Sequence, residues 1–158
     1  MNDQEVRIIQ LPAMRLASVS AYGPTPEDEA WKNLEAYARQ HGFFESLETS
    51  HRIFGFNNPN PSLGSPNYGY EFWVTVGPEI DGPEIREMPG GAYAVLRWDG
   101  MGNPYETIPA AWQKLVQWAE QSPYRLVERP CLEEHLKPTH QVDNGFMLDL
   151  YLGIENRG

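Results

Sequence analysis

Short stretches of alternating hydrophobic and polar residues recur along the chain, and this pattern is typical of strands with one buried face. The clearest stretch is Arg-Leu-Ala-Ser-Val-Ser-Ala-Tyr at residues 15–22, which follows a candidate strand at 5–11 and a Pro12-Ala13 turn. Residues 57–69 are rich in Asn, Pro, Gly and Ser, so we expect a long loop, either a lid over a binding site or a tolerated insertion. Further strands are expected at 51–56, 70–76, 83–88, 92–98, 131–136 and 146–154.

Two segments carry the helical spacing of apolar residues instead. The first begins after Thr25, a candidate N-cap followed by acidic residues, and ends at Gly42. The second is expected over residues 104–120. Trp31 and Trp112 lie at apolar positions of these helices, and we expect both in the core. The other periodic residues are Leu34, Tyr37 and Ala38 in the first helix, and Ile108, Leu115, Val116 and Ala119 in the second.

The two halves of the chain match each other residue by residue. Ala30-Trp31 corresponds to Ala111-Trp112, and Glu71-Phe72-Trp73-Val74 corresponds to Asp149-Leu150-Tyr151-Leu152. We therefore expect a single α+β domain over residues 1–158, built as a tandem duplication of a strand-strand-helix-strand-strand unit, with repeats at about 5–78 and 83–155. Antiparallel sheets with helices on one face leave the other face open, so a ligand groove between the two copies is the expected binding site.

Composition and charge exclude several function classes. Lys and Arg total 12 against 22 Asp and Glu, for a net charge of -10 that is spread over both halves, so we expect no direct nucleic-acid binding. The chain contains no long apolar run and its start lacks a signal-peptide pattern, so neither a membrane span nor export is expected. Cys131 is the sole cysteine, which excludes an internal disulfide and a cysteine zinc cluster. We expect a cytoplasmic protein with no metal site and no cofactor.

Aromatic residues form 12% of the chain, and several stand beside acidic residues. Trp73 follows Glu71, Trp98 precedes Asp99, and Tyr151 follows Asp149. An aromatic wall around a carboxylate is what a flat cationic ligand needs, since the carboxylate offsets its charge and the rings attract it. Ordinary core packing is the competing interpretation for each single ring.

Residues 130–136 (Pro-Cys-Leu-Glu-Glu-His-Leu) allow an argument from strand alternation. On a strand, Leu132, Glu134 and Leu136 share one face, and Cys131, Glu133 and His135 share the other. If the leucines face the helix layer, Glu133 faces the groove, where it could bind a cation or act as a general base. The alternative is an exposed edge strand with two solvated acids.

Four segments of the sequence resemble those of a known family. The resemblance covers essentially the whole chain and rests on four segments: Ser122-Pro123-Tyr124-Arg125-Leu126, Pro130-Cys131-Leu132-Glu133-Glu134-His135-Leu136, Leu148-Asp149-Leu150-Tyr151-Leu152-Gly153-Ile154, and Met88-Pro89-Gly90-Gly91-Ala92-Tyr93-Ala94-Val95. These segments are similar to those of the GyrI-like small-molecule-binding family. That family includes the DNA gyrase inhibitory protein and the effector-binding domains of AraC-type and MerR-type multidrug regulators.

The resemblance implies a groove lined by aromatic residues, with a pocket glutamate that maps to Glu133. The family's usual tyrosine two residues later is His135 here, which changes a pocket hydrogen bond. A stand-alone domain that binds small hydrophobic or cationic aromatic compounds is the implied function. Two alternatives are a hydrolase of cyclopropane-type toxins with Glu133 as general base, and an inhibitor that binds a protein such as DNA gyrase. The candidate ligand-binding residues are Glu133, His135, Trp98, Trp73, Tyr151, Tyr93, Tyr70 and Phe56.

Overall fold

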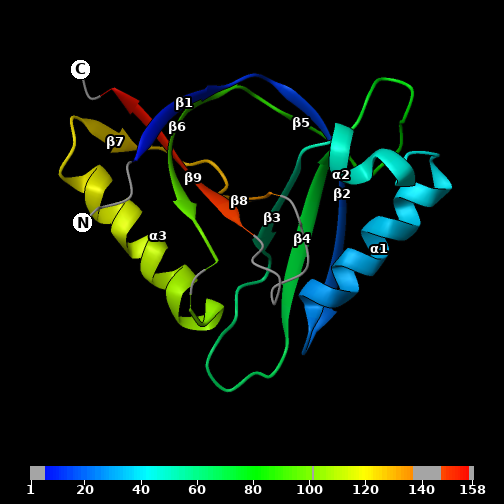
Figure 1. Ribbon diagram of the computed structural model, residues 1–158, viewed down its shortest axis with the longest axis horizontal. Helices are drawn as coiled ribbons and strands as arrows, with labels where there is room; N and C mark the ends of the chain where they lie inside the picture. The colour runs from blue at the N-terminus through cyan, green and yellow to red at the C-terminus, as the bar shows by residue number, and fades with distance from the viewer. Residues whose placement is uncertain (1–5, 101, 137–146, 157–158) are drawn as a thin grey trace. The chain divides into compact units, whose positions relative to one another are not determined.

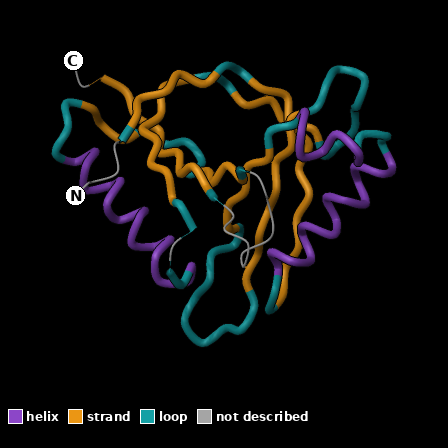
Figure 2. The backbone as a smooth tube through the Cα atoms, viewed as in Figure 1, coloured by secondary structure: helices purple, strands orange, loops and turns teal. Residues whose placement is uncertain are grey.

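The computed structural model describes residues 6–100, 102–136 and 147–156, which belong to two compact units. Unit 1 consists of Met1–Ala13 and Pro89–Gly158, and unit 2 consists of Met14–Met88. In the part of the chain that the structure describes, each unit contains an antiparallel sheet and one long helix that packs on it (Figure 2). The expected α+β class is therefore confirmed.

Unit 2 is a four-stranded sheet with the strand order β5-β2-β4-β3, in which all neighbours are antiparallel. Its strands are β2 (Met14–Gly23), β3 (Ile53–Asn57), β4 (Tyr68–Thr75) and β5 (Ile85–Met88). The helix α1 (Pro26–Gln40) lies along β2 and β4 (Figure 1). Two short helices, for which no pattern was found in the sequence, follow it: η1 (Phe44–Ser46) and α2 (Leu47–Ser50).

The ends of α1 are set by local sequence. Pro26 occupies the start of the helix, and three acidic residues in the first turn complement the helix dipole. Thr25 stands at the N-cap position as expected, although its hydroxyl makes no capping hydrogen bond. At the other end, Gly42 has a φ of 81°, and the Phe43 amide donates to the Ala38 carbonyl at 2.9 Å. Glycine adopts this left-handed conformation without strain, so the helix ends where the sequence predicts.

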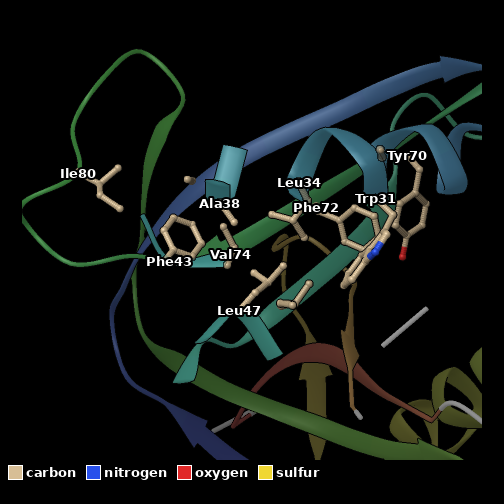
Figure 3. Close-up of a cluster of buried hydrophobic side chains, with 12 residues drawn as sticks. Trp31, Leu34, Ala38, Phe43, Leu47, Tyr70, Phe72, Val74 and Ile80 are labelled. Carbon is tan, nitrogen blue, oxygen red and sulfur yellow. The ribbon is translucent and has the colours of Figure 1, made fainter. Parts of the chain in front are cut away.

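One face of α1 and one face of the sheet enclose the core of unit 2 (Figure 3). Trp31 is 6% exposed, as the helical pattern predicts, and its ring packs edge-on against Phe72 at 5.6 Å between centroids. The other buried members shown are Leu34, Ala38, Phe43, Leu47, Tyr70, Val74 and Ile80.

Unit 1 has the corresponding strand order β1-β6-β9-β8, again antiparallel throughout. Its strands are β1 (Arg7–Leu11), β6 (Gly91–Trp98), β8 (Leu132–His135) and β9 (Leu148–Asn156), and β7 (Tyr124–Leu126) pairs with β9. The helix α3 (Pro104–Glu120) packs against β6, β7 and β9 (Figure 1). No helix among the described residues is both long and apolar enough to cross a membrane.

The pairing of the first strands differs from the expected repeats. The expected repeats at 5–78 and 83–155 assign β1 and β2 to one repeat and β5 and β6 to the other, whereas β1 pairs with β6 and β5 pairs with β2. A two-residue hairpin needs a positive φ in its turn, and neither Gly90 nor Gly91 has one, while Pro12 is fixed at negative φ. The two linkers therefore do not fold back as tight hairpins.

Alternation along β6 and β9 gives the sheet of unit 1 two different faces. Toward α3, the strands contribute only apolar side chains, which pack on Leu115 and Ala119 of the helix. These are Ala94, Leu96 and Trp98 from β6, and Leu148, Leu150, Leu152 and Ile154 from β9. The opposite face, called the far face of unit 1 below, carries Tyr93, Val95 and Arg97 from β6 and Asp149, Tyr151 and Gly153 from β9.

Candidate functional site

Glu133 and Glu134 lie on opposite faces of unit 1, and the assignment is the reverse of the one that the leucines suggested. Glu133 is paired with Leu150, on the α3 side, and its Oε2 accepts a hydrogen bond from the Trp112 indole at 3.2 Å. Glu134 is paired with Asp149, so it lies on the far face together with Leu132. The expectation that Leu132 faces the helix and Glu133 faces away from it is therefore wrong.

Glu134 is a buried carboxylate, 8% exposed, on the far face of unit 1. The Tyr151 hydroxyl donates a hydrogen bond of 2.7 Å to its Oε1. Tyr151 in turn packs edge-on against Tyr93, with 5.7 Å between ring centroids. Because a buried carboxylate keeps its charge only with donors or cations nearby, this acid beside two rings is suited to a cation that arrives with its water removed.

The second buried acid of this face, Asp149, is already neutralised. It is 5% exposed and accepts hydrogen bonds from the Arg97 guanidinium at 2.5 and 3.3 Å. A nitrogen of Arg7 lies 3.0 Å from the same carboxylate. The hydrogen bond to Asp149 raises the pKa of Arg97, so the arginine stays charged. Asp149 therefore forms a structural ion pair with Arg97 and Arg7, whereas Glu134 is held by the hydroxyl of Tyr151.

Unit 2 has its own acid on the face away from α1. Glu71 accepts hydrogen bonds from the Ser18 hydroxyl at 2.5 Å, the Trp73 indole at 2.7 Å and the Asn58 amide at 3.3 Å. The Trp73 ring packs edge-on against Phe56 at 4.9 Å. Three donors satisfy this carboxylate, so the cluster of Phe56, Glu71 and Trp73 is a hydrogen-bonded aromatic patch.

The structure brings together some predicted site residues and separates others. Tyr93 and Tyr151 meet on the far face of unit 1, and Phe56 and Trp73 meet in unit 2. Trp98 belongs to the core under α3, where its indole donates to the Thr107 hydroxyl at 3.0 Å. The remaining two also lie on helix-facing sides: Tyr70 packs against Phe72 in the core of unit 2, and His135 is paired with Leu148.

A hollow of about 370 Å³ lies on the surface of α3, lined by Trp112, Gln113, Val116 and Gln117. Trp112 is half-buried at its wall and is not one of the fully enclosed core residues. The expectation for Trp112 holds in part, because the residue packs against the core of unit 1 without being fully enclosed. The hollow does not include any residue of the far face.

Residues 132–135 form a strand as expected, but the two faces of that strand are assigned in reverse. Its alternation argument was sound, since Leu132 and Glu134 do share a face and Glu133 and His135 share the other. The error was to assign the leucines to the helix layer, because Leu132 is fully buried on the far face instead, paired with Tyr151. The register of β8 on β9 decides this, and the sequence carries no local signal for that register.

The comparisons with known proteins agree with this architecture. The sequence model of the GyrI-like small molecule binding domain matches residues 4–155. A search of curated proteins gives no match. The C-terminal domain of EcmrR superimposes with a TM-score of 0.65 at 16% identity, covering 97% of this chain and 98% of that one. In the complex of EcmrR with DNA, this chain spans 57% of the length of the EcmrR chain, with a TM-score of 0.66 and 17% identity.

Two other solved structures share the fold at a similarly low sequence identity. A hydrolase from Listeria innocua has a TM-score of 0.64 and 13% identity, with 98% of this chain and 94% of that chain covered. SAV2435, which was solved bound to tetraphenylphosphonium, has a TM-score of 0.54 and 13% identity, with coverage of 96% and 94%. At such identities these likenesses show a common fold only.

Proposed function

The chain belongs to the GyrI-like small-molecule-binding domain family, and from this premise we propose that it binds lipophilic aromatic cations at Glu134. The observation that carries the proposal is a buried carboxylate, hydrogen-bonded by Tyr151, beside the Tyr93–Tyr151 ring pair on a face that α3 does not cover. Glu134 supplies the charge, and the two rings supply apolar area and cation–π attraction of about 0.5–2 kcal/mol per contact.

The burial of these groups sets a condition on binding. Tyr93 is 0%, Tyr151 2% and Glu134 8% exposed, so a ligand reaches them only through a local opening. The free energy of that opening reduces the apparent affinity, because only the open fraction of molecules binds. A ligand must therefore be apolar enough to repay the opening with buried area.

Two neighbouring substitutions make a matched test. Titration calorimetry with tetraphenylphosphonium and with ethidium, a planar cation, should show binding that Glu134→Gln weakens by about tenfold or more. Glu133→Gln changes the same kind of group one residue away on the other face, and it should leave both affinities within about twofold. If Glu133→Gln is the damaging substitution, or if neither cation binds the folded protein, the proposal is wrong.

A second candidate function is hydrolysis of a reactive, cyclopropane-type compound. The observation that favours it is the 2.7 Å hydrogen bond between Tyr151 and Glu134, since a positioned carboxylate can take a proton from an attacking water molecule. A hydrolase with the same fold adds to its interest. Turnover of a cyclopropane-bearing alkylating agent should then be abolished by Glu134→Gln, and turnover that survives this substitution rules the mechanism out.

A further inference from the structure

The side chain of Arg129 lies across two glycines of unit 1. A β-carbon placed on Gly91 would stand 2.6 Å from the guanidinium carbon of Arg129, and one on Gly153 would stand 3.2 Å from its Cβ. The distance at Gly91 is shorter than real β-carbons show, and the one at Gly153 is tighter than most real contacts, so larger residues at these two positions would displace the arginine. Glycine in β6 and in β9 thus leaves the room in which Arg129 lies against the sheet.

The guanidinium of Arg129 reaches Tyr93. Its Nη1 donates to the Ala92 carbonyl at 2.7 Å, and its central carbon lies 5.3 Å from the centroid of the Tyr93 ring. This arginine is half-buried, and its planar group carries five N–H donors, of which the carbonyl takes one. A permanent positive charge is therefore fixed beside the aromatic pair.

The hydroxyl of Tyr93 is a buried polar group beside the Arg129 guanidinium, and no hydrogen bond of good geometry reaches it from the described residues. Burial raises the pKa of Tyr93, and the charge and donors of the Arg129 guanidinium lower it only in part, so the phenol keeps a proton that it can donate. A buried donor without an acceptor destabilises the folded state, and a ligand bearing an acceptor would remove that loss.

These groups follow one another in space as a cation, two rings and an anion. Arg129 contacts Tyr93, Tyr93 contacts Tyr151, and Tyr151 donates to Glu134. Along β9, Arg129 lies over Gly153 and Glu134 is paired with Asp149, four positions away, which is about 13 Å at strand spacing. The two opposite charges thus stand at the two ends of the ring pair.

We propose that the preferred ligand class is an amphoteric aromatic compound, with a cationic group at Glu134 and a carboxylate or similar acceptor at Tyr93 and Arg129. This inference rests on the proposed function, because it uses the same site and adds a second pole to it. A simple lipophilic cation satisfies Glu134 alone and places its uncharged end beside Arg129. An amphoteric ligand places its cationic group at Glu134 and its carboxylate at Arg129, where the carboxylate also accepts a hydrogen bond from the Tyr93 hydroxyl.

A pair of synthetic probes separates the two possibilities. One is a biphenyl with an aminomethyl group at one end and a carboxylate at the other; the second is its methyl ester, which has the same rings and amine but no negative charge. Calorimetry on the wild-type protein should show the carboxylate binding about tenfold tighter than the ester, the contribution expected of one charge-assisted hydrogen bond. Equal binding, or tighter binding of the ester, overturns the inference.

Substitutions of single residues then show which side chains cause the preference for the carboxylate over the ester. Arg129→Met keeps the apolar stem and should bring the two affinities within about twofold of each other, and Tyr93→Phe should weaken the carboxylate but not the ester. Arg125→Met is the control, because Arg125 pairs with Glu155 at the end of β9 and should leave the preference unchanged. If Arg129→Met does not fold, Gly91→Ala displaces the same guanidinium without removing its charge.

The outcomes distinguish this inference from the function on which it rests. Binding of the ester and of tetraphenylphosphonium through Glu134, without any preference for the carboxylate, overturns the amphoteric class and leaves the proposed function standing. A preference that persists in Arg129→Met or in Gly91→Ala, with the variant folded, assigns it elsewhere and overturns the role of Arg129. Failure of all three compounds to bind overturns both.

Discussion

Glu133 and Glu134 are consecutive in the chain, yet their carboxylates accept hydrogen bonds on opposite faces of one sheet. Trp112 of α3 donates to Glu133, and Tyr151 of β9 donates to Glu134. The alternation of a strand produces this division, and it lets the two acids serve different purposes. Glu133 ties β8 to the helix, whereas Glu134 is the acid that we assign to a ligand.

Replacing the donor of Glu133 should affect stability and leave ligand binding unchanged. Trp112→Phe removes the indole N–H but keeps a ring on α3, so the free energy of unfolding should fall by about 0.5–1.5 kcal/mol. The affinity for tetraphenylphosphonium should stay within about twofold of wild type, since Glu134 is untouched. Urea unfolding and calorimetry measure the two quantities, with Trp118→Phe on the same helix as the control. If Trp112→Phe lost as much affinity as Glu134→Gln, the two glutamates would not have the separate roles that we assign to them.

Truncation of a side chain in the core under α3 should destabilise the protein much more than truncation of one that lines the hollow beside it. Leu115 is 0% exposed among the apolar side chains of β6 and β9, so Leu115→Ala should lower the free energy of unfolding by about 2–5 kcal/mol. Val116 is half-buried and lines the surface hollow, so Val116→Ala should cost clearly less in the same urea titration. Equal losses would mean that the helix is packed differently.

The loop between β3 and β4 depends on a close backbone contact at its base. A β-carbon on Gly69 would lie 2.0 Å from the Asn58 carbonyl oxygen, which belongs to the backbone and cannot rotate away. Gly69→Ala should therefore destabilise unit 2 by about 1–3 kcal/mol. Leu63, fully exposed in the same loop, supplies the comparison, and Leu63→Ala should leave the melting temperature unchanged. A Gly69→Ala variant as stable as wild type would disprove the contact.

The Tyr37–Glu84 pair predicts a pH dependence of stability in unit 2. The Tyr37 hydroxyl donates to Glu84 at 2.8 Å, and this hydrogen bond holds the pKa of Glu84 below its ordinary value of 4.5. A carboxyl with a lowered pKa in the folded state stabilises the protein above its unfolded pKa, and that contribution is lost as the pH falls through the folded pKa.

The corresponding experiment is a series of melting temperatures between about pH 3 and pH 7. Tyr37→Phe should lower the melting temperature more at pH 7 than at pH 3, because protonated Glu84 no longer gains from the donor. Tyr22→Phe, an exposed tyrosine of β2, should show no such trend. A difference between wild type and Tyr37→Phe that is constant with pH would show that the hydrogen bond contributes nothing.

Local sequence determined the elements of this protein and their class. Helix spacing at Trp31 and Leu115 and strand alternation at residues 148–154 sufficed, because these patterns report which side of an element meets a core. Gly42 ended α1 where expected, since glycine adopts this left-handed φ without the steric clash that a β-carbon causes. The short strand β7 was missed, because three residues are too few for a periodic pattern.

Only the tertiary structure decided which strands pair and which face of β8 carries the candidate acid. The pairing of β1 with β6 and of β5 with β2 depends on contacts between residues far apart in the chain. The burial of Leu132 on the far face and the approach of Arg129 to Tyr93 depend on such contacts too. A shift of one residue in register would exchange the positions of Glu133 and Glu134 without changing any local preference. The sequence thus supplied both carboxylates, and the pairing of β8 with β9 selected between them.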